Sequence, residues 1–124
     1  MKTIHITCHL QDEFLQAILK TAVKNIGHWA KAQEYEKDLY ELTYCYEDSD
    51  IADFQPQALS LYTIAIGMQK ALQVSQTLMG RNICSHRFQS RIFLAIRETD
   101  PTYIDPSCAD AIVQIGLFEE IIYK

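Results

Sequence analysis

The chain has 124 residues, of which 48% are hydrophobic and 22% are charged, and its formal net charge is −5 at pH 7. This length predicts a single domain over residues 1–124, with a core large enough to fold without disulfides or a metal. The acidic balance argues against direct binding to nucleic acid phosphates as a property of the whole molecule. No apolar run approaches the roughly 20 residues of a membrane span, and no signal-peptide pattern is present at the N-terminus. We therefore expect a cytoplasmic protein without membrane contact, and reduced, buried cysteines.

The N-terminal third predicts strands around one helix. Polar and apolar residues alternate over residues 2–9, which is typical of a half-buried strand. From Asp12 the apolar residues recur at helical spacing, and Gly27 is placed to end this helix in a left-handed cap. Aromatic-rich strands are predicted over residues 28–36 and 39–47, with a tight turn at Lys37-Asp38 and with the tyrosine-bearing face of the second strand packed.

The middle of the chain predicts a short edge strand and a long helix. Residues 51–59, interrupted by Pro56, could add the strand. Ser60 is a good N-cap for a helix whose apolar residues continue to Met79, with Gly80 at its end. Gly67 inside this helix either permits the close approach of another element or is simply tolerated.

Two more helices complete the pattern. A helix over residues 86–97 carries several arginines, and Asp100-Pro101 breaks it. The last helix has Asp105 as N-cap, Pro106 in its first turn, and an apolar stripe behind them. Runs of strands and helices without regular alternation predict an α+β fold, in which a small antiparallel sheet of three to four strands packs against about four helices.

The end of the chain resembles the tail of a family of small uncharacterised proteins from phages, prophages and other mobile elements. The residues that carry the resemblance are Ile104-Asp105, Ala109-Asp110-Ala111-Ile112-Val113-Gln114, Leu117-Phe118 and Glu120-Ile121-Ile122-Tyr123. The Trp29-Ala30 pair and the Ile66-Gly67-Met68 step are also similar to that family. The family has Gly where this chain has Glu119 and Lys124, so we expect the last helix to continue through Glu119-Glu120. The resemblance implies no catalytic residues, and it implies a setting in which small accessory proteins often bind and disable host machinery.

Charges are segregated along the sequence. Acidic residues crowd the predicted hairpin and its exit, at Glu34, Glu36, Asp38, Glu41, Glu47, Asp48, Asp50 and Asp53. They form either a solvated strand face or a surface that docks into a basic groove on a partner. A basic stretch follows, with Arg81, His86, Arg87, Arg91 and Arg97. These residues either hold an anion or nucleotide, since guanidinium groups match phosphate, or form ordinary salt bridges, for example to the acidic hairpin.

Two Cys/His groups contain the atoms that a zinc site or a Cys–His nucleophile needs, at Cys8-His9 and Cys84-Ser85-His86. Their spacing is unlike that of common structural zinc motifs, and nothing in the sequence places an orienting third group beside a Cys–His nucleophile. Phosphate-binding and hydrolase motifs are absent from the sequence. We therefore expect no enzyme activity, no cofactor and no metal.

Three functions follow as hypotheses. The leading one is a non-enzymatic phage or mobile-element accessory protein that binds a host protein or protein–nucleic acid complex stoichiometrically, as an anti-defence inhibitor of the anti-CRISPR kind. The second is a protein that sequesters a small ligand or nucleotide through its Arg/His patch. The third is a homodimeric structural protein without a host target, although a homodimer is compatible with all three.

Overall fold

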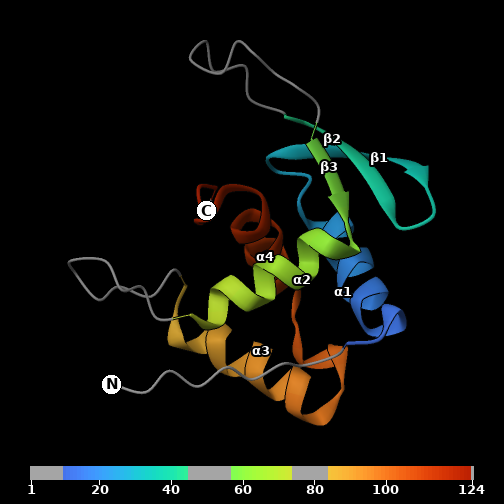
Figure 1. Ribbon diagram of the computed structural model, residues 1–124. Helices are drawn as coiled ribbons and strands as arrows, with labels where there is room; N and C mark the ends of the chain where they lie inside the picture. Colours follow the sequence, from blue (N-terminus) through green and yellow to red (C-terminus); the bar gives the residue numbers. More distant parts are fainter. Residues whose placement is uncertain (1–9, 45–56, 74–83, 124) are drawn as a thin grey trace.

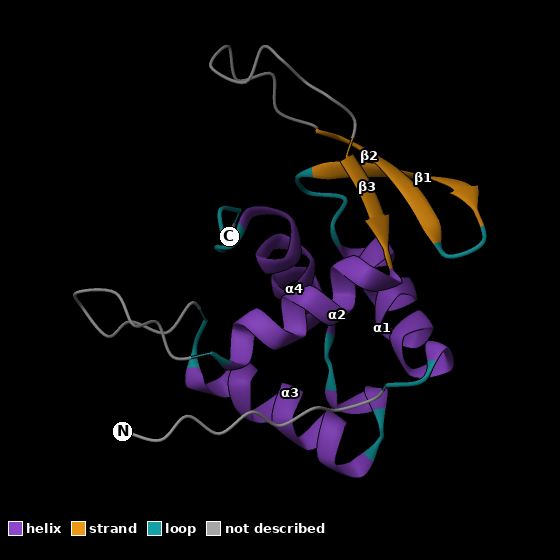
Figure 2. Cartoon of the chain, viewed as in Figure 1, coloured by secondary structure: helices purple, strands orange, loops and turns teal. Residues whose placement is uncertain are grey.

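The computed structural model describes residues 10–44, 57–73 and 84–123 (Figure 1). The fold is α+β, as predicted, and the described residues form four α-helices and a three-stranded antiparallel sheet at one end of the helical body (Figure 2). The elements are α1 (Asp12–Asn25), β1 (Ala30–Glu36), β2 (Leu39–Tyr44), β3 (Gln57–Ser60), α2 (Leu61–Leu72), α3 (His86–Glu98), the 3-10 helix η2 (Pro101–Tyr103) and α4 (Pro106–Phe118). The strand predicted over residues 2–9 lies outside the described residues. None of the described helices is both long enough and apolar enough to cross a membrane.

Helix α1 confirms the predicted helix but ends differently. Its apolar stripe is buried in the core, as the spacing predicted. The left-handed cap expected at Gly27 is wrong, because Gly27 does not take a left-handed conformation. The chain instead turns through Ile26, whose carbonyl accepts hydrogen bonds from the Trp29 and Ala30 amides at 3.0 and 2.9 Å. The carbonyl of the C-cap residue Ile26 is thus hydrogen-bonded, and no residue with positive φ is needed to end the helix.

The hairpin of β1 and β2 confirms the two predicted strands, although β1 begins at Ala30 because His28 and Trp29 lie in a turn. Residues 45–47 of the second predicted strand lie outside the described residues. The turn at Lys37-Asp38 places Asp38 at φ 59°, which a β-hairpin turn requires and an Asp side chain tolerates. The register shifts between Glu34 and Glu36, so that a bulge lies opposite the start of β2. Leu42 is fully buried while its neighbours along the strand are exposed, and the packed face is the predicted one.

Strand β3 pairs antiparallel with β2 and leads directly into α2. The first part of the predicted edge strand, residues 51–56, lies outside the described residues. The Ser60 amide donates to Thr63 Oγ1 at 3.2 Å, which confirms Ser60 as the N-cap. Helix α2 ends at Leu72, because Gln73 takes an extended conformation, and the rest of the predicted continuation to Met79 and Gly80 lies outside the described residues. The Ala71 carbonyl, which a continued helix would use internally, accepts a hydrogen bond from Gln89 Nε2 at 2.9 Å.

Caps also set the bounds of α3 and α4. Ser85 caps α3, and Asp105 caps α4 by accepting from the Cys108 amide at 2.8 Å. The predicted extension of the last helix through Glu119-Glu120 is wrong, because α4 ends at Phe118 and Glu119 takes a left-handed conformation with φ 64°. Glu119 therefore caps α4 in the conformation that a glycine most often takes at this position.

Helices α2 and α4 cross in close backbone contact. A Cβ atom at Gly67 would overlap the carbonyl oxygen of Ile112 and lie 2.9 Å from its carbonyl carbon. A Cβ atom at Gly116 would lie 3.2 Å from the carbonyl carbon of Thr63. This confirms the close approach at Gly67, where only a residue without a side chain fits.

We expect Gly67→Ala to lower the free energy of unfolding by at least about 2 kcal/mol, because the backbones of two packed helices must separate to admit a methyl group. Gly27→Ala is the matched control, since a Cβ atom there meets nothing within 4 Å. Urea unfolding followed by circular dichroism measures both, and equal stabilities of the two variants would contradict the close crossing.

Candidate functional site

The β1–β2 hairpin exposes the acidic residues predicted to form a working surface. Glu34 lies opposite Tyr40 in the ladder, so its side chain leaves the strand on the other face from that of Glu41. Glu34 and Glu36 on β1 and Glu41 on β2 are exposed, and Tyr35 between the first two is 71% exposed. We call Glu34, Tyr35, Glu36 and Glu41 the acidic sheet surface. Of the other predicted members, Asp38 is half-buried and its Oδ2 accepts from Gln16 Nε2 of α1 at 2.6 Å. Glu47, Asp48, Asp50 and Asp53 lie outside the described residues.

The three glutamates of this surface have no side-chain partner among residues 10–44, 57–73 and 84–123. None of them forms an ion pair or a hydrogen bond through its side chain to another residue in the described part of the chain. Burial raises the pKa of Tyr40, and the nearby carboxylates of Glu34 and Asp38 raise it further. With four acidic residues and two lysines over residues 30–44, the hairpin therefore presents net negative charge to solvent.

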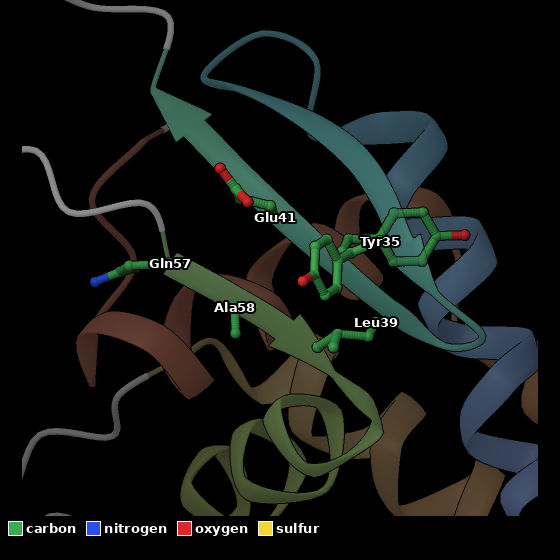
Figure 3. Close-up of a pocket in the computed structure, with 6 residues that line it drawn as sticks. Tyr35, Leu39, Glu41, Gln57 and Ala58 are labelled. Atoms are coloured by element: carbon green, nitrogen blue, oxygen red, sulfur yellow. The ribbon is translucent and has the colours of Figure 1, made fainter.

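An open hollow of about 230 Å³ lies in this surface (Figure 3). Its lining comes from all three strands, namely Tyr35, Leu39, Tyr40, Glu41, Gln57 and Ala58. Glu41 and Ala58 are directly opposite each other in the ladder, and their side chains therefore lie on the same face. Tyr35 lies in the bulge, where the register shift leaves it without a partner residue on β2.

The predicted basic patch is largely engaged within the molecule. Arg87 Nη2 and Arg91 Nε lie 3.3 and 3.5 Å from the same carboxylate oxygen, Asp105 Oδ2. Arg91 Nη1 also donates to the Tyr103 carbonyl at 3.4 Å. These arginines therefore pair with the N-cap of α4, and no described arginine pairs with the acidic hairpin.

The two ends of the basic patch differ. Arg97 Nη2 lies 3.0 Å from Glu98 Oε1, and its guanidinium carbon is 6.0 Å from the centroid of the Phe93 ring. His86 is exposed at the first residue of α3. Arg81 lies outside the described residues, so the structure brings together only Arg87 and Arg91 of the predicted set.

The described cysteines are buried free thiols, as expected. Burial raises the pKa of Cys84, and burial together with the Asp105 carboxylate raises the pKa of Cys108 to about 12. Both thiols are therefore protonated at neutral pH, whereas a nucleophile or a metal ligand must be a thiolate. No group of three or more metal-binding side chains occurs among the described residues, and Cys8 and His9 lie outside them.

Asp110 organises a polar network that the sequence analysis missed. Its Oδ1 accepts from Trp29 Nε1 and Gln114 Nε2, both at 2.9 Å, and its Oδ2 lies 2.6 Å from His28 Nε2. A recognisable signal was present, since Asp110 and Gln114 are four residues apart within an otherwise apolar helix.

Gln114 closes this network onto the end of the chain. Its side chain is buried, its Nε2 also donates to the Tyr123 carbonyl, and its Oε1 accepts from the Ile122 and Tyr123 amides at 2.9 and 2.7 Å. The Tyr123 ring then stacks on Trp29 with centroids 5.1 Å apart and planes 5° apart. Trp29, Asp110, Gln114 and Tyr123, which belong to the resemblance, thus form one structural unit.

No family model matches this chain, and no curated protein and no solved structure matches it either. The chemistry of the described surfaces is therefore the basis for a function. Among these surfaces, the acidic sheet surface combines exposure, unpaired charge and a hollow.

We expect Asp110→Ala to lower the free energy of unfolding by at least about 2 kcal/mol, because it leaves the donors of Trp29 and Gln114 without their acceptor. Glu120→Ala removes an exposed carboxylate nearby in sequence and should stay within about 0.5 kcal/mol of the unmodified protein. Urea unfolding followed by Trp29 fluorescence measures both. A loss for Asp110→Ala no larger than for Glu120→Ala would show that the network does not stabilise the fold.

Proposed function

We propose that this protein is a non-enzymatic accessory protein of a phage or mobile element that binds a host macromolecule stoichiometrically through the acidic sheet surface. In its specific form, the proposal is inhibition of a host defence complex, as anti-CRISPR proteins inhibit theirs. The resemblance of the tail supports the phage setting, and the acidic sheet surface supports binding as the mode of action. The proposed partner is a host protein, or a protein–nucleic acid complex, with a basic groove.

The observation that carries this proposal is the contrast between the two charged regions. Described arginines at Arg87, Arg91 and Arg97 have carboxylate partners within the molecule, whereas Glu34, Glu36 and Glu41 have none among the described residues. Exposed charge of one sign on a hairpin attracts a partner of the opposite sign and accelerates association. An exposed tyrosine amid that charge adds the kind of side chain that often dominates binding energy.

Reversal of the three charges tests the proposal. We expect the combined variant Glu34→Lys, Glu36→Lys and Glu41→Lys to lose at least about tenfold in affinity for the host partner, equivalent to about 1.4 kcal/mol. The partner is first captured from a bacterial lysate and identified, and affinity is then measured with the purified pair. A control variant reverses three exposed glutamates elsewhere, Glu13, Glu98 and Glu120.

The control carries the same change in net charge, so it separates a local surface from a general electrostatic effect. Equal loss in both variants, or no loss in either, would contradict the proposal. Sedimentation of the protein alone adds a further check. A dimer that dissociates only in the hairpin variant would assign this surface to self-association instead of to a host partner.

One observation favours a second candidate, the binding of an anion or nucleotide. Arg87 and Arg91 are one helical turn apart, and their side chains remain 67% and 38% exposed although both approach Asp105. Guanidinium groups that share one carboxylate retain donors for a phosphate. Asp105 already neutralises part of their charge, which makes this candidate the weaker of the two.

A thermal-shift screen of nucleotides decides this second candidate. Since the basic patch is engaged within the molecule, we expect no nucleotide to raise the melting temperature. A true ligand at about 100 times its dissociation constant would add about 2.7 kcal/mol of stability. A nucleotide that stabilises the protein, but not the combined variant Arg87→Gln and Arg91→Gln, would establish the second candidate.

A further inference from the structure

The hollow in the acidic sheet surface has a lining of mixed chemistry. Glu41 supplies a carboxylate, Tyr35 supplies an exposed aromatic ring, and Leu39 and Ala58 supply apolar contact. These groups come from three different strands, and backbone hydrogen bonds hold the strands in register. Such a combination selects a ligand with one charged end and an apolar stem.

The charge of that ligand is set by the surroundings. The β1–β2 hairpin from Ala30 to Tyr44 carries four acidic residues and two lysines. Glu41 has no hydrogen-bond or ion-pair partner among the described residues. The hollow therefore favours a cation and disfavours an anion or a phosphate.

We propose that the hollow receives an arginine side chain of the partner protein. The guanidinium group is planar, so it can stack on the Tyr35 ring while it donates two parallel hydrogen bonds to the Glu41 carboxylate. Its aliphatic stem would cover Leu39 and Ala58. A lysine ammonium lacks the planar fork, so it would use the charge of Glu41 but not the whole site.

This inference rests on the proposed function, because it names the group by which the host partner is anchored. It places Glu41 and Tyr35 at the centre of the contact and leaves Glu34 and Glu36 to attract the partner from a distance. Electrostatic attraction by rim charges changes mainly the association rate, whereas a seated side chain changes mainly the dissociation rate.

The test is an NMR titration of the isotopically labelled protein with N-acetyl-arginine amide, and separately with N-acetyl-lysine amide. A single side chain is expected to bind with a dissociation constant on the order of 1 mM, which amide chemical shifts detect. We expect shifts confined to residues 35–41 and 57–58 and binding of arginine at least about threefold tighter than of lysine. Shifts spread over many acidic residues, or equal binding of the two probes, would overturn the proposal.

Substitutions locate the two contacts. Glu41→Gln keeps the shape of the side chain and should weaken arginine binding by at least about tenfold, and Tyr35→Leu should remove the preference for arginine over lysine. Matched controls are Glu13→Gln, an exposed glutamate on α1, and Tyr62→Leu, a 74% exposed tyrosine on α2. An unchanged amide spectrum away from the hollow shows that each variant is folded. Retention of full arginine binding by Glu41→Gln would overturn the site.

The outcomes separate this site from the broader function. If arginine amide fails to bind while capture of the host partner still depends on Glu34, Glu36 and Glu41, the arginine site is wrong and the proposed function stands. If arginine amide binds at Glu41 but no host partner depends on this surface, the site stands and the proposed function is wrong.

Discussion

The crossing of α2 and α4 is the contact on which the arrangement of this protein depends. Gly67 and Gly116 let two helix backbones meet where side chains would overlap a carbonyl group on the facing helix. The consequence reaches the sheet, because Ser60 is both the last residue of β3 and the N-cap of α2. The packing of two helices therefore fixes the edge strand that forms one wall of the hollow.

A second constraint acts at the other edge of the sheet. Asp110 and Gln114 of α4 hold the Trp29 indole and the backbone of Tyr123, and Trp29 immediately precedes β1. Every polar group of the buried Gln114 side chain is hydrogen-bonded, so the network stabilises the core without the cost of an unsatisfied polar atom. Asp110 and Gln114 thus act in packing, and the exposed residues of the sheet remain available for binding.

The charged side chains of the described residues fall into two groups: some form ion pairs that support the fold, and others form none. Arg87 and Arg91 serve the start of α4 by pairing with its N-cap, Asp105. Glu34, Glu36 and Glu41 serve no such role among the described residues, although unpaired like charges on one hairpin repel each other. No contact within the described part of the molecule explains their presence, and the proposed binding to a basic partner would explain it.

The sequence by itself determined the local elements, because helical spacing, strand alternation and capping residues such as Ser60 and Asp105 act over a few residues. It also identified the acidic hairpin, since the strands and their turn are local. Only the tertiary structure decided where α2 ends, because Gln89 of α3 takes the carbonyl at its last turn. Only the tertiary structure paired the arginines with Asp105, assembled the Asp110 network and brought β3 beside β2 to complete the hollow. These contacts join residues far apart in the chain, and no local pattern encodes which distant groups will meet.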